Sequence, residues 1–485
     1  MAEFERRFRV RKPVSVFNTS DKEKVHESAL RVMETVGIMV HSEAARDSLR
    51  KAGAVVDDAS KVVRFPTDVV SSLTRTVPST ITLAGRTEDH DLPVDSAHYY
   101  FTTDGCGIQV YDSVTKSRRS SVLADITKTA RIADWLPYLS IYEPMVVASD
   151  MPSDQHVLMG MKEAMENTTK HIETESTTTV EEARAQVRMA AEVVGSMDAL
   201  LERHYISAMV CTVSPLTLEG PATDVAMVWA ENHVPVHITG MAQLGLTGPA
   251  TIPGDLVLNH AETLGLACII QAHSPGAPLL YGSVLSSMDP MTGAVDFGSP
   301  ETIQLALGSA EMARFMRWPG SCGGIGPGAI VPGIRATIEN SLMAMSAAMV
   351  GSEIMNGIGL LDCSTVLSYE QMLIDNEMVG HTLGVCKEVE FTDEALALEV
   401  IEKVGIGGTY LTERHTLKHA RSFHRPVLWG GETFDGWKDA GGKDTLELAR
   451  EKADWILREH RPEPLDDEVS SRLGEIVKGG ARQAA

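Results

Sequence analysis

The chain has 485 residues, of which 43% are hydrophobic and 22% charged, and it carries a net charge of −23. This length exceeds that of one small domain and suits a barrel-sized domain with accessory segments. Because a strongly acidic chain repels phosphate groups and anionic lipid headgroups, we expect neither nucleic acid nor a membrane surface among its partners.

The cysteines and the N-terminus bear on the cellular compartment. The six cysteines include no C-x-x-C pair, which is typical of reduced thiols rather than of a disulfide framework. No apolar run is long enough to cross a membrane, and the basic N-terminus is not followed by the apolar stretch of a secretion signal. These features predict a cytoplasmic protein.

Residues 1–90 are predicted to form an α-rich N-terminal extension. Apolar residues at helical spacing indicate two amphipathic helices between residues 21 and 57, broken at Gly37 and Gly53. A third short helix follows at 65–78. No pattern in this extension points to chemistry.

Residues 91–365 show a regular alternation of strand-like and helical patterns. The strand-like runs are short, apolar and often β-branched, as buried parallel strands are; they lie near 99–111, 139–147, 170–175, 205–213, 235–239, 278–282, 319–323 and 354–358. Eight strand–helix units in roughly 260 residues are what a (β/α)8 TIM barrel, an α/β fold, requires. We expect residues 366–485 to be helical and to pack on this barrel.

A glycine-rich stretch at 320–333 is the one candidate for nucleotide binding. It contains a G-x-G-x-x-A match, but a proline interrupts the match and Pro332 blocks the helix that should follow. The acidic residue expected some 20 residues further on is absent. We therefore predict no nucleotide. A loop without side chains is suited instead to close approach by a large flat cofactor, lying against Gly324, Gly326 and Gly328.

The sequence pattern for a metal site is equally weak. Cys211 and Cys322 fall at predicted strand ends, but no cysteine or histidine pair has the spacing of a zinc site, and His381 is expected on a helix surface. We predict that this chain ligates no metal. A catalytic zinc site with cysteine ligands at the strand ends remains an alternative.

Seven phrases in the sequence, in this order and spacing, carry a likeness to a known family. They are HESALRVMETVGIMVHSEAA, FPTDVV, YYFTTDGCGIQVYD, TKSRRSSVLADITKTARIADWLP, NTTKH, SPGAPLLYG and EKVGIGGTYLTERHTLKHAR. Over nearly its full length the chain resembles the trimethylamine methyltransferase superfamily. Because it contains no unusual residue, it resembles the pyrrolysine-free branch, which includes glycine betaine:corrinoid methyltransferases.

The resemblance implies a TIM barrel and methyl transfer from a methylated amine to a Co(I) corrinoid, carried by a separate corrinoid-binding protein. Relatives often have a Ser-Asp-Ala-Lys-like phrase after the glycine-rich strand, where this chain reads GPGAIVPG. We therefore expect a quaternary amine such as glycine betaine rather than trimethylamine. The enzyme would orient and desolvate this cation and admit the corrin face.

Candidate substrate-binding residues follow from the chemistry of a quaternary ammonium, which binds to aromatic faces and to nearby acids. We expect a cage of Phe101, Tyr142 and Tyr281, with Glu143 as the acid and Phe297 as a lid. Arg335 and Asn356 are the candidates to meet a betaine carboxylate. No catalytic residue is assigned. One alternative is that these rings only pack the core. A separate alternative is a non-catalytic quaternary-amine-binding barrel. We also expect a homo-oligomer.

Overall fold

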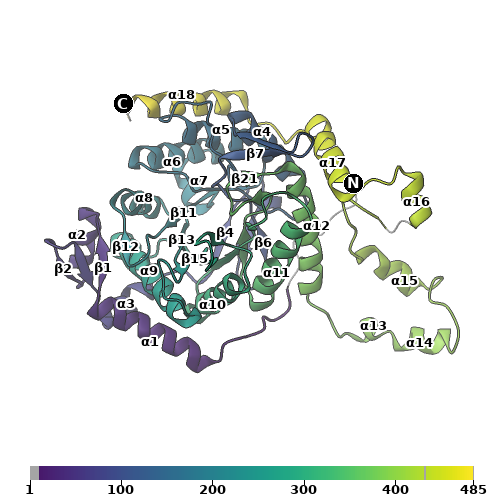
Figure 1. The fold of residues 1–485 in the computed structure, drawn as a ribbon, viewed down its shortest axis with the longest axis horizontal. Coiled ribbons are helices and arrows are strands. Elements are labelled where there is room, and N and C mark those ends of the chain that lie inside the picture. Colours follow the sequence, from purple (N-terminus) through teal and green to yellow (C-terminus); the bar gives the residue numbers. More distant parts are fainter. Residues whose placement is uncertain (1–9, 431–432, 484–485) are drawn as a thin grey trace.

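The computed structural model describes residues 10–430 and 433–483, and their centre is an eight-stranded parallel barrel (Figure 1). Its strands, in order around the barrel, are β6 (Tyr100–Phe101), β9 (Ile141–Tyr142), β10 (His171–Thr174), β11 (Ile206–Cys211), β13 (Val236–Gly240), β15 (Leu279–Ser283), β18 (Gly320–Gly324) and β19 (Ile354–Asn356). β19 pairs with β6, and a bridge between Thr102 and Ile141 closes the ring. The predicted (β/α)8 fold is confirmed.

Eight main helices surround the strands. They are α4 (Leu123–Trp135), α5 (His156–Asn167), α6 (Val180–Val194), α8 (Gly220–Glu231), α9 (Ile252–His273), α10 (Pro300–Met316), α11 (Ile334–Val350) and α12 (Tyr369–Cys386). Each follows one barrel strand, so α12, at the start of the segment predicted as 366–485, takes the place of the eighth barrel helix. The amino-terminal end of the barrel is closed by the hairpin of β4 (Ile81–Leu83) and β5 (Leu92–Val94), whose side chains pack on Tyr100 and Leu280.

The N-terminal extension packs against the barrel rather than standing apart. Its elements are α1 (Thr19–Thr35), β1 (Ile38–Val40), α2 (Glu43–Lys51), β2 (Val55–Asp57), β3 (Val62–Arg64) and α3 (Thr67–Thr74). All three helices pack on α9, and β1 pairs in parallel with β12 (Thr217–Leu218), which follows β11.

The C-terminal segment combines packed helices with a protruding arm. α17 (Thr445–Glu459) packs on α12 and α4, and α18 (Asp467–Gln483) packs on α5 and α6. Between α12 and α17, the described residues from 388 to 440 form what we call the arm. Its helices, none of which buries a residue, stand off the barrel in Figure 1: α13 (Asp393–Leu396), α14 (Leu398–Val404), α15 (Arg414–His419) and α16 (Phe434–Asp439). Of the helices that the structure describes, none is long and apolar enough to span a membrane.

Candidate functional site

The strand alternation decides which side chains face the barrel interior, because successive residues of a strand point to opposite faces. His237 of β13 points inward. A Cβ on Gly282 of neighbouring β15 would overlap the Nε2 of His237, so the missing side chain makes room for the imidazole. On the other side, Nδ1 of His237 lies 2.9 Å from Oε1 of Glu173 on β10. The Nε2 atom is buried and finds no hydrogen-bond partner among the described residues.

Four carboxyl groups meet near this histidine at the carboxyl-terminal end of the barrel. We call them the acidic cluster: Asp104, Glu143, Glu173 and Glu175. They follow or end β6, β9 and β10, and parallel strands bring their carboxyl ends to one rim, where barrel enzymes place their active sites. Asp104, Glu143 and Glu173 are at most 7% exposed. Glu175 is held by the Gly105 amide, which donates to Oε2 at 3.0 Å.

Burial and mutual repulsion divide the acidic cluster into protonated and ionised members. Burial and the charges of Glu173, Glu175 and Asp104 raise the pKa of Glu143 well above its usual value. Burial, with the charge of Asp104, raises the pKa of Glu175 to about 8. For Glu173, burial also acts upward, but the pairing with His237 outweighs it and the pKa is lowered. At neutral pH, Glu173 is therefore ionised, while Glu143 and Glu175 hold protons.

Two cysteines lie beside the acidic cluster. The Cys106 sulfur is 2.9 Å from Oε1 of Glu175. Although part of Cys106 is exposed, burial of its thiol together with the charges of Asp104 and Glu175 raises the thiol pKa, and burial raises that of Cys211. Both are thiols at neutral pH, which makes them poor nucleophiles. Ligand atoms of Asp104, Cys106 and Glu175 lie within 4.8 Å of one another, a spacing compatible with a metal ion.

The predicted aromatic cage is not formed in the structure. The Tyr142 hydroxyl lies 2.9 Å from Oγ1 of Thr129 on α4, and the Tyr281 hydroxyl lies 3.0 Å from Nδ1 of His260 on α9. Both rings therefore lie between the strands and the helices. Phe101 follows the inward-facing Tyr100 and so points outward as well. The physical reason is the period of two along each strand, which puts Glu143 inside and its neighbour Tyr142 outside.

The other predicted site residues fall into two groups at the barrel rim. Asn356, buried at the end of β19, adjoins Gly324, where a Cβ would lie 3.8 Å from the asparagine Oδ1. Arg335 lies near Gly328 and is 64% exposed, and its Nε is 2.7 Å from Oε1 of Glu339.

Phe297 is half-buried beside Asp296, which also approaches Gly328. Gly326 is buried and abuts Ser364, so the absence of a side chain there serves close packing of two chain segments. The glycines that remain partly exposed are Gly324 and Gly328.

Among the acids of the cluster, only Glu143 was predicted from the sequence as a site residue; Asp104, Glu173 and Glu175, with His237 and Cys106, were not. The signal for Glu173 was present in the run HIETE, because Glu173 and Glu175 are two residues apart and so share one face of a strand. His237 was hidden because an imidazole on an apolar strand resembles a core residue.

Comparisons with known proteins identify the family of this chain. The model of the family "Trimethylamine methyltransferase (MTTB)" matches residues 3–484. A trimethylamine methyltransferase MttB of Desulfitobacterium hafniense is 31% identical over 465 residues, covering 95% of this chain and 93% of the relative. A glycine betaine methyltransferase of the same species, strain Y51, is 29% identical over 469 residues, or 96% of each chain.

Among solved structures, the monomethylamine methyltransferase (MtmB) of Methanosarcina barkeri is 13% identical, with a TM-score of 0.48. The match covers 90% of this chain and 93% of that one. Since the family model spans nearly the whole sequence, the chain belongs to the trimethylamine methyltransferase (MTTB) family and is a methyltransferase.

Proposed function

We propose that this enzyme transfers a methyl group from a quaternary amine, glycine betaine or a related betaine, to the Co(I) of a corrinoid carried by a separate protein. The observation that supports this most is the acidic cluster at the carboxyl-terminal end of the barrel. The relative named glycine betaine methyltransferase supports the same substrate class. Co(I) is a strong reductant, so the reaction suits a reducing cytoplasm.

A quaternary ammonium has no N–H group, so it is recognised by its charge and shape rather than by hydrogen bonds. A carboxylate 4 Å from the cation contributes about 4 kcal/mol at an effective dielectric constant of about 20. Entry of the cation lowers the pKa values of Glu143 and Glu175, because an opposite charge favours the ionised form. Binding therefore exchanges bound protons for one permanent cation.

Methyl transfer then needs positioning more than acid–base chemistry. Co(I) attacks the methyl carbon in line, the C–N bond breaks, and its electron pair stays on nitrogen, which leaves as a neutral tertiary amine. Since the leaving group needs no proton, the barrel contributes orientation and exclusion of water. We assign the betaine carboxylate to the amide of Asn356, with Arg335 attracting it at the rim. The corrin ring would lie against Gly324 and Gly328, whereas Gly326 is buried.

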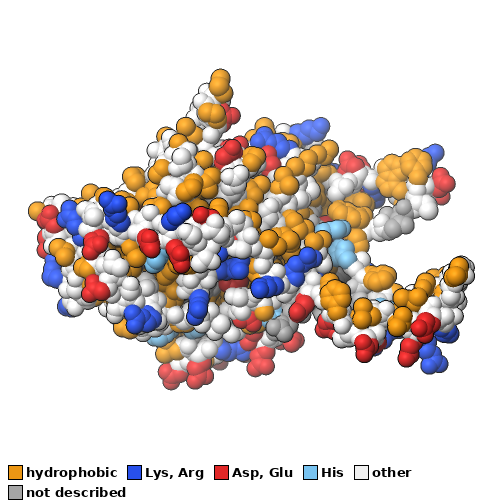
Figure 2. Space-filling view, turned by 90° about the horizontal axis from the view of Figure 1, so that it is seen from below, with side chains coloured by type: hydrophobic (Ala, Val, Ile, Leu, Met, Phe, Trp, Pro, Cys, Tyr) orange, Lys and Arg blue, Asp and Glu red, His pale blue; other side chains and the backbone are white. Residues whose placement is uncertain are grey.

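The arm supports assembly with a second copy of the chain. Several of its large apolar side chains are exposed, including Phe391 (81%), Leu411 (82%) and Phe434 (71%). Figure 2 shows apolar side chains spread over the protruding part of the molecule. Patches of this kind commonly mark protein interfaces. We infer a homo-oligomer in which arms cover apolar surface of neighbouring copies.

One observation favours a second candidate function. The grouping of Asp104, Cys106 and Glu175 would suit a zinc-dependent methyltransferase in which the metal binds a thiol acceptor. In that case, activity would require a thiol instead of a corrinoid, would be lost with a chelator, and would be lost in Cys106→Ser.

The test is to follow cob(I)alamin absorbance with the purified chain and a panel of quaternary amines. We expect turnover with a betaine and none with trimethylamine. Glu143→Gln cannot ionise, so it should weaken betaine binding at least about tenfold, equivalent to ~1.4 kcal/mol. The matched control is Glu301→Gln on the exposed first turn of α10, which should change nothing. Betaine binding without turnover would instead identify a non-catalytic barrel, and a folded chain inactive with the whole panel would refute the proposal.

A further inference from the structure

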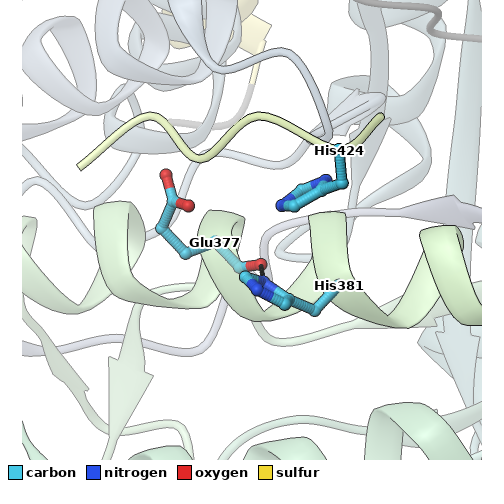
Figure 3. A group of neighbouring side chains, drawn as sticks. All are labelled: Glu377, His381 and His424. Carbon is cyan, nitrogen blue, oxygen red and sulfur yellow. Dashed lines mark hydrogen bonds between the residues drawn. The ribbon is translucent and has the colours of Figure 1, made fainter. Parts of the chain in front are cut away.

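A second group of metal-ligating side chains lies on the outside of the barrel, at the base of the arm. Glu377 and His381 are four residues apart and so share one face of α12. His424 follows the short helix η2 (Ala420–Ser422) within the arm. Figure 3 shows its ring reaching from this segment toward His381. Ligand atoms of the three residues lie within 4.8 Å of one another.

The hydrogen bonds of Glu377 and His381 leave one ligand atom free on each. Nδ1 of His381 lies 2.8 Å from the backbone carbonyl oxygen of Glu377, which can only accept, so Nδ1 carries the proton and Nε2 keeps its lone pair. Such a bond commonly orients a metal-binding histidine. Oε1 of Glu377 accepts from the amides of Val427 and Leu428 at 2.6 and 2.9 Å. Its Oε2 is buried and has no partner among the described residues.

His424 is positioned by the rings and the helix around it. Its ring stacks on Tyr138, with centroids 6.0 Å apart. A Cβ on Gly380 would come within 2.9 Å of Cε1 of His424, so α12 lacks a side chain where the ring approaches. The Trp429 ring also lies near the site, with its centroid 6.3 Å from that of His381.

The geometry points to a Zn²⁺ site formed by Glu377, His381 and His424, which ties the base of the arm to the barrel. Two imidazoles and a carboxylate are ligands that zinc prefers, and tetrahedral zinc leaves a fourth position for water. Bonds of about 2.0–2.1 Å require ligand atoms roughly 3.3 Å apart. Side-chain rotation of the two exposed histidines can close the remaining gap.

The position of the site indicates a structural role. α12 follows a barrel strand, so it begins at Tyr369 beside the acidic rim and runs toward the opposite face. His381 lies twelve residues further on, about 18 Å along the helix axis at 1.5 Å per residue. A metal there is too far from the acidic cluster to touch substrate. It would instead join two segments about 40 residues apart, closing a long loop that is otherwise held by few contacts.

Zinc binding to the chelator-stripped full-length chain tests this inference without any methyl donor. Calorimetry with Zn²⁺, and the absorption spectrum of added Co²⁺, should both report one ion at this site. His381→Ala and His424→Ala should each weaken Zn²⁺ binding by about a hundredfold or more. Glu377→Gln should do the same while keeping an acceptor for the Val427 and Leu428 amides. His415→Ala, on exposed α15 of the arm, is the matched control and should bind Zn²⁺ normally.

A second readout keeps the inference testable if a variant folds poorly. In the unmodified chain, Zn²⁺ should slow hydrogen exchange of backbone amides in residues 420–430. Cys106→Ser separates this site from a metal at the acidic cluster and should leave the exchange effect intact. The inference is overturned if the stripped chain takes up no Zn²⁺. It is equally overturned if the bound ion survives His381→Ala and His424→Ala but is lost in Cys106→Ser.

Discussion

Glu143, Glu173 and Glu175 occupy one buried cluster, yet their protonation differs because their partners differ. Glu173 has the His237 imidazole at 2.9 Å, and Glu175 has the Gly105 amide and the Cys106 thiol. No N–H or O–H group of the described residues donates to either carboxyl oxygen of Glu143. Pairing with His237 is therefore the main reason why Glu173 is ionised, and the carboxyl groups of the site differ in protonation rather than carrying equal charges.

Tyr281→Phe tests the outward position of the predicted cage rings. The substitution removes the 3.0 Å hydrogen bond to the buried His260, so the free energy of unfolding should fall by about 1–2 kcal/mol. Betaine affinity should stay within about twofold, because the ring does not face the acidic cluster. Urea denaturation and calorimetry measure the two effects. A tenfold loss of affinity with unchanged stability would show instead that the Tyr281 ring lies in the binding site.

Glu175 should make the folded state less stable as pH rises. Its carboxyl has a pKa of about 8 in the folded chain, against about 4.3 when unfolded. Between these values the folded state holds a proton that the unfolded state has lost, so the free energy of unfolding decreases with pH. Glu175→Gln stays neutral and should reduce this slope in urea denaturation between about pH 5 and 8. Glu301→Gln should keep it, and an unaltered slope in Glu175→Gln would contradict the assignment.

At the scale of elements, the sequence predicts those that have a strong pattern. Several barrel strands are short, mostly apolar runs, such as β11 (Ile206–Cys211), and the helix start at Ser299 is confirmed by its side chain accepting from the Thr302 amide. The three-residue strands β1, β2 and β3 were missed, because such short runs have no measurable period. The prediction of the aromatic cage was wrong for a related reason. The residues at strand ends were predicted correctly as barrel positions, but which face each one occupies depends on the phase of the alternation.

The sequence also could not reveal the pairing of α12 with the arm. His381 and His424 are distant in the chain, and only the return of the 420–430 segment onto α12 brings their rings to a centroid distance of 4.5 Å. No spacing within the sequence indicates such a contact, so the sequence predicted His381 only as a residue on a helix surface.

Gly380→Ala should destabilise α12 even though alanine is the better helix former by about 1 kcal/mol. The added Cβ would lie 2.5 Å from Cε2 of Tyr138 and 2.9 Å from Cε1 of His424, and crowding of this kind costs about 1–3 kcal/mol. Thermal unfolding measures the net change. Gly384→Ala on the same helix, where nothing lies within 4 Å of the added carbon, is the control and should stabilise the protein. A stabilising Gly380→Ala would show that the arm does not rest on α12.

At the scale of the whole molecule, the barrel and the arm differ in how they are held. The barrel has a continuous buried core, whereas α13 to α16 bury no residue of their own. Helices of four to seven residues are not stable alone in water. The arm therefore depends on contacts outside itself, at α12 and, in the proposed oligomer, on another copy of the chain.

Replacing Phe391 and Leu411 together by serine should weaken self-association without unfolding the barrel. Both side chains are more than 80% exposed, so the barrel core loses nothing. Light scattering after size-exclusion chromatography should show a smaller assembly than the unmodified chain. Met291→Ser removes an equally exposed apolar side chain outside the arm and should leave the mass unchanged. An unmodified chain that runs as a monomer would rule out the proposed oligomer.

The raised pKa values of Glu143 and Glu175 have a consequence for turnover in the proposed reaction. While a permanent cation occupies the barrel, it offsets one further negative charge, so that one of these two carboxyl groups can stay ionised beside it. Once the methyl group has left, the amine nitrogen carries no permanent charge, and nothing offsets the additional carboxylate. This carboxylate takes up a proton again, the attraction that retained the ligand weakens, and the spent amine departs. Reprotonation of the carboxyl group would thus return the enzyme to the state that accepts its next substrate.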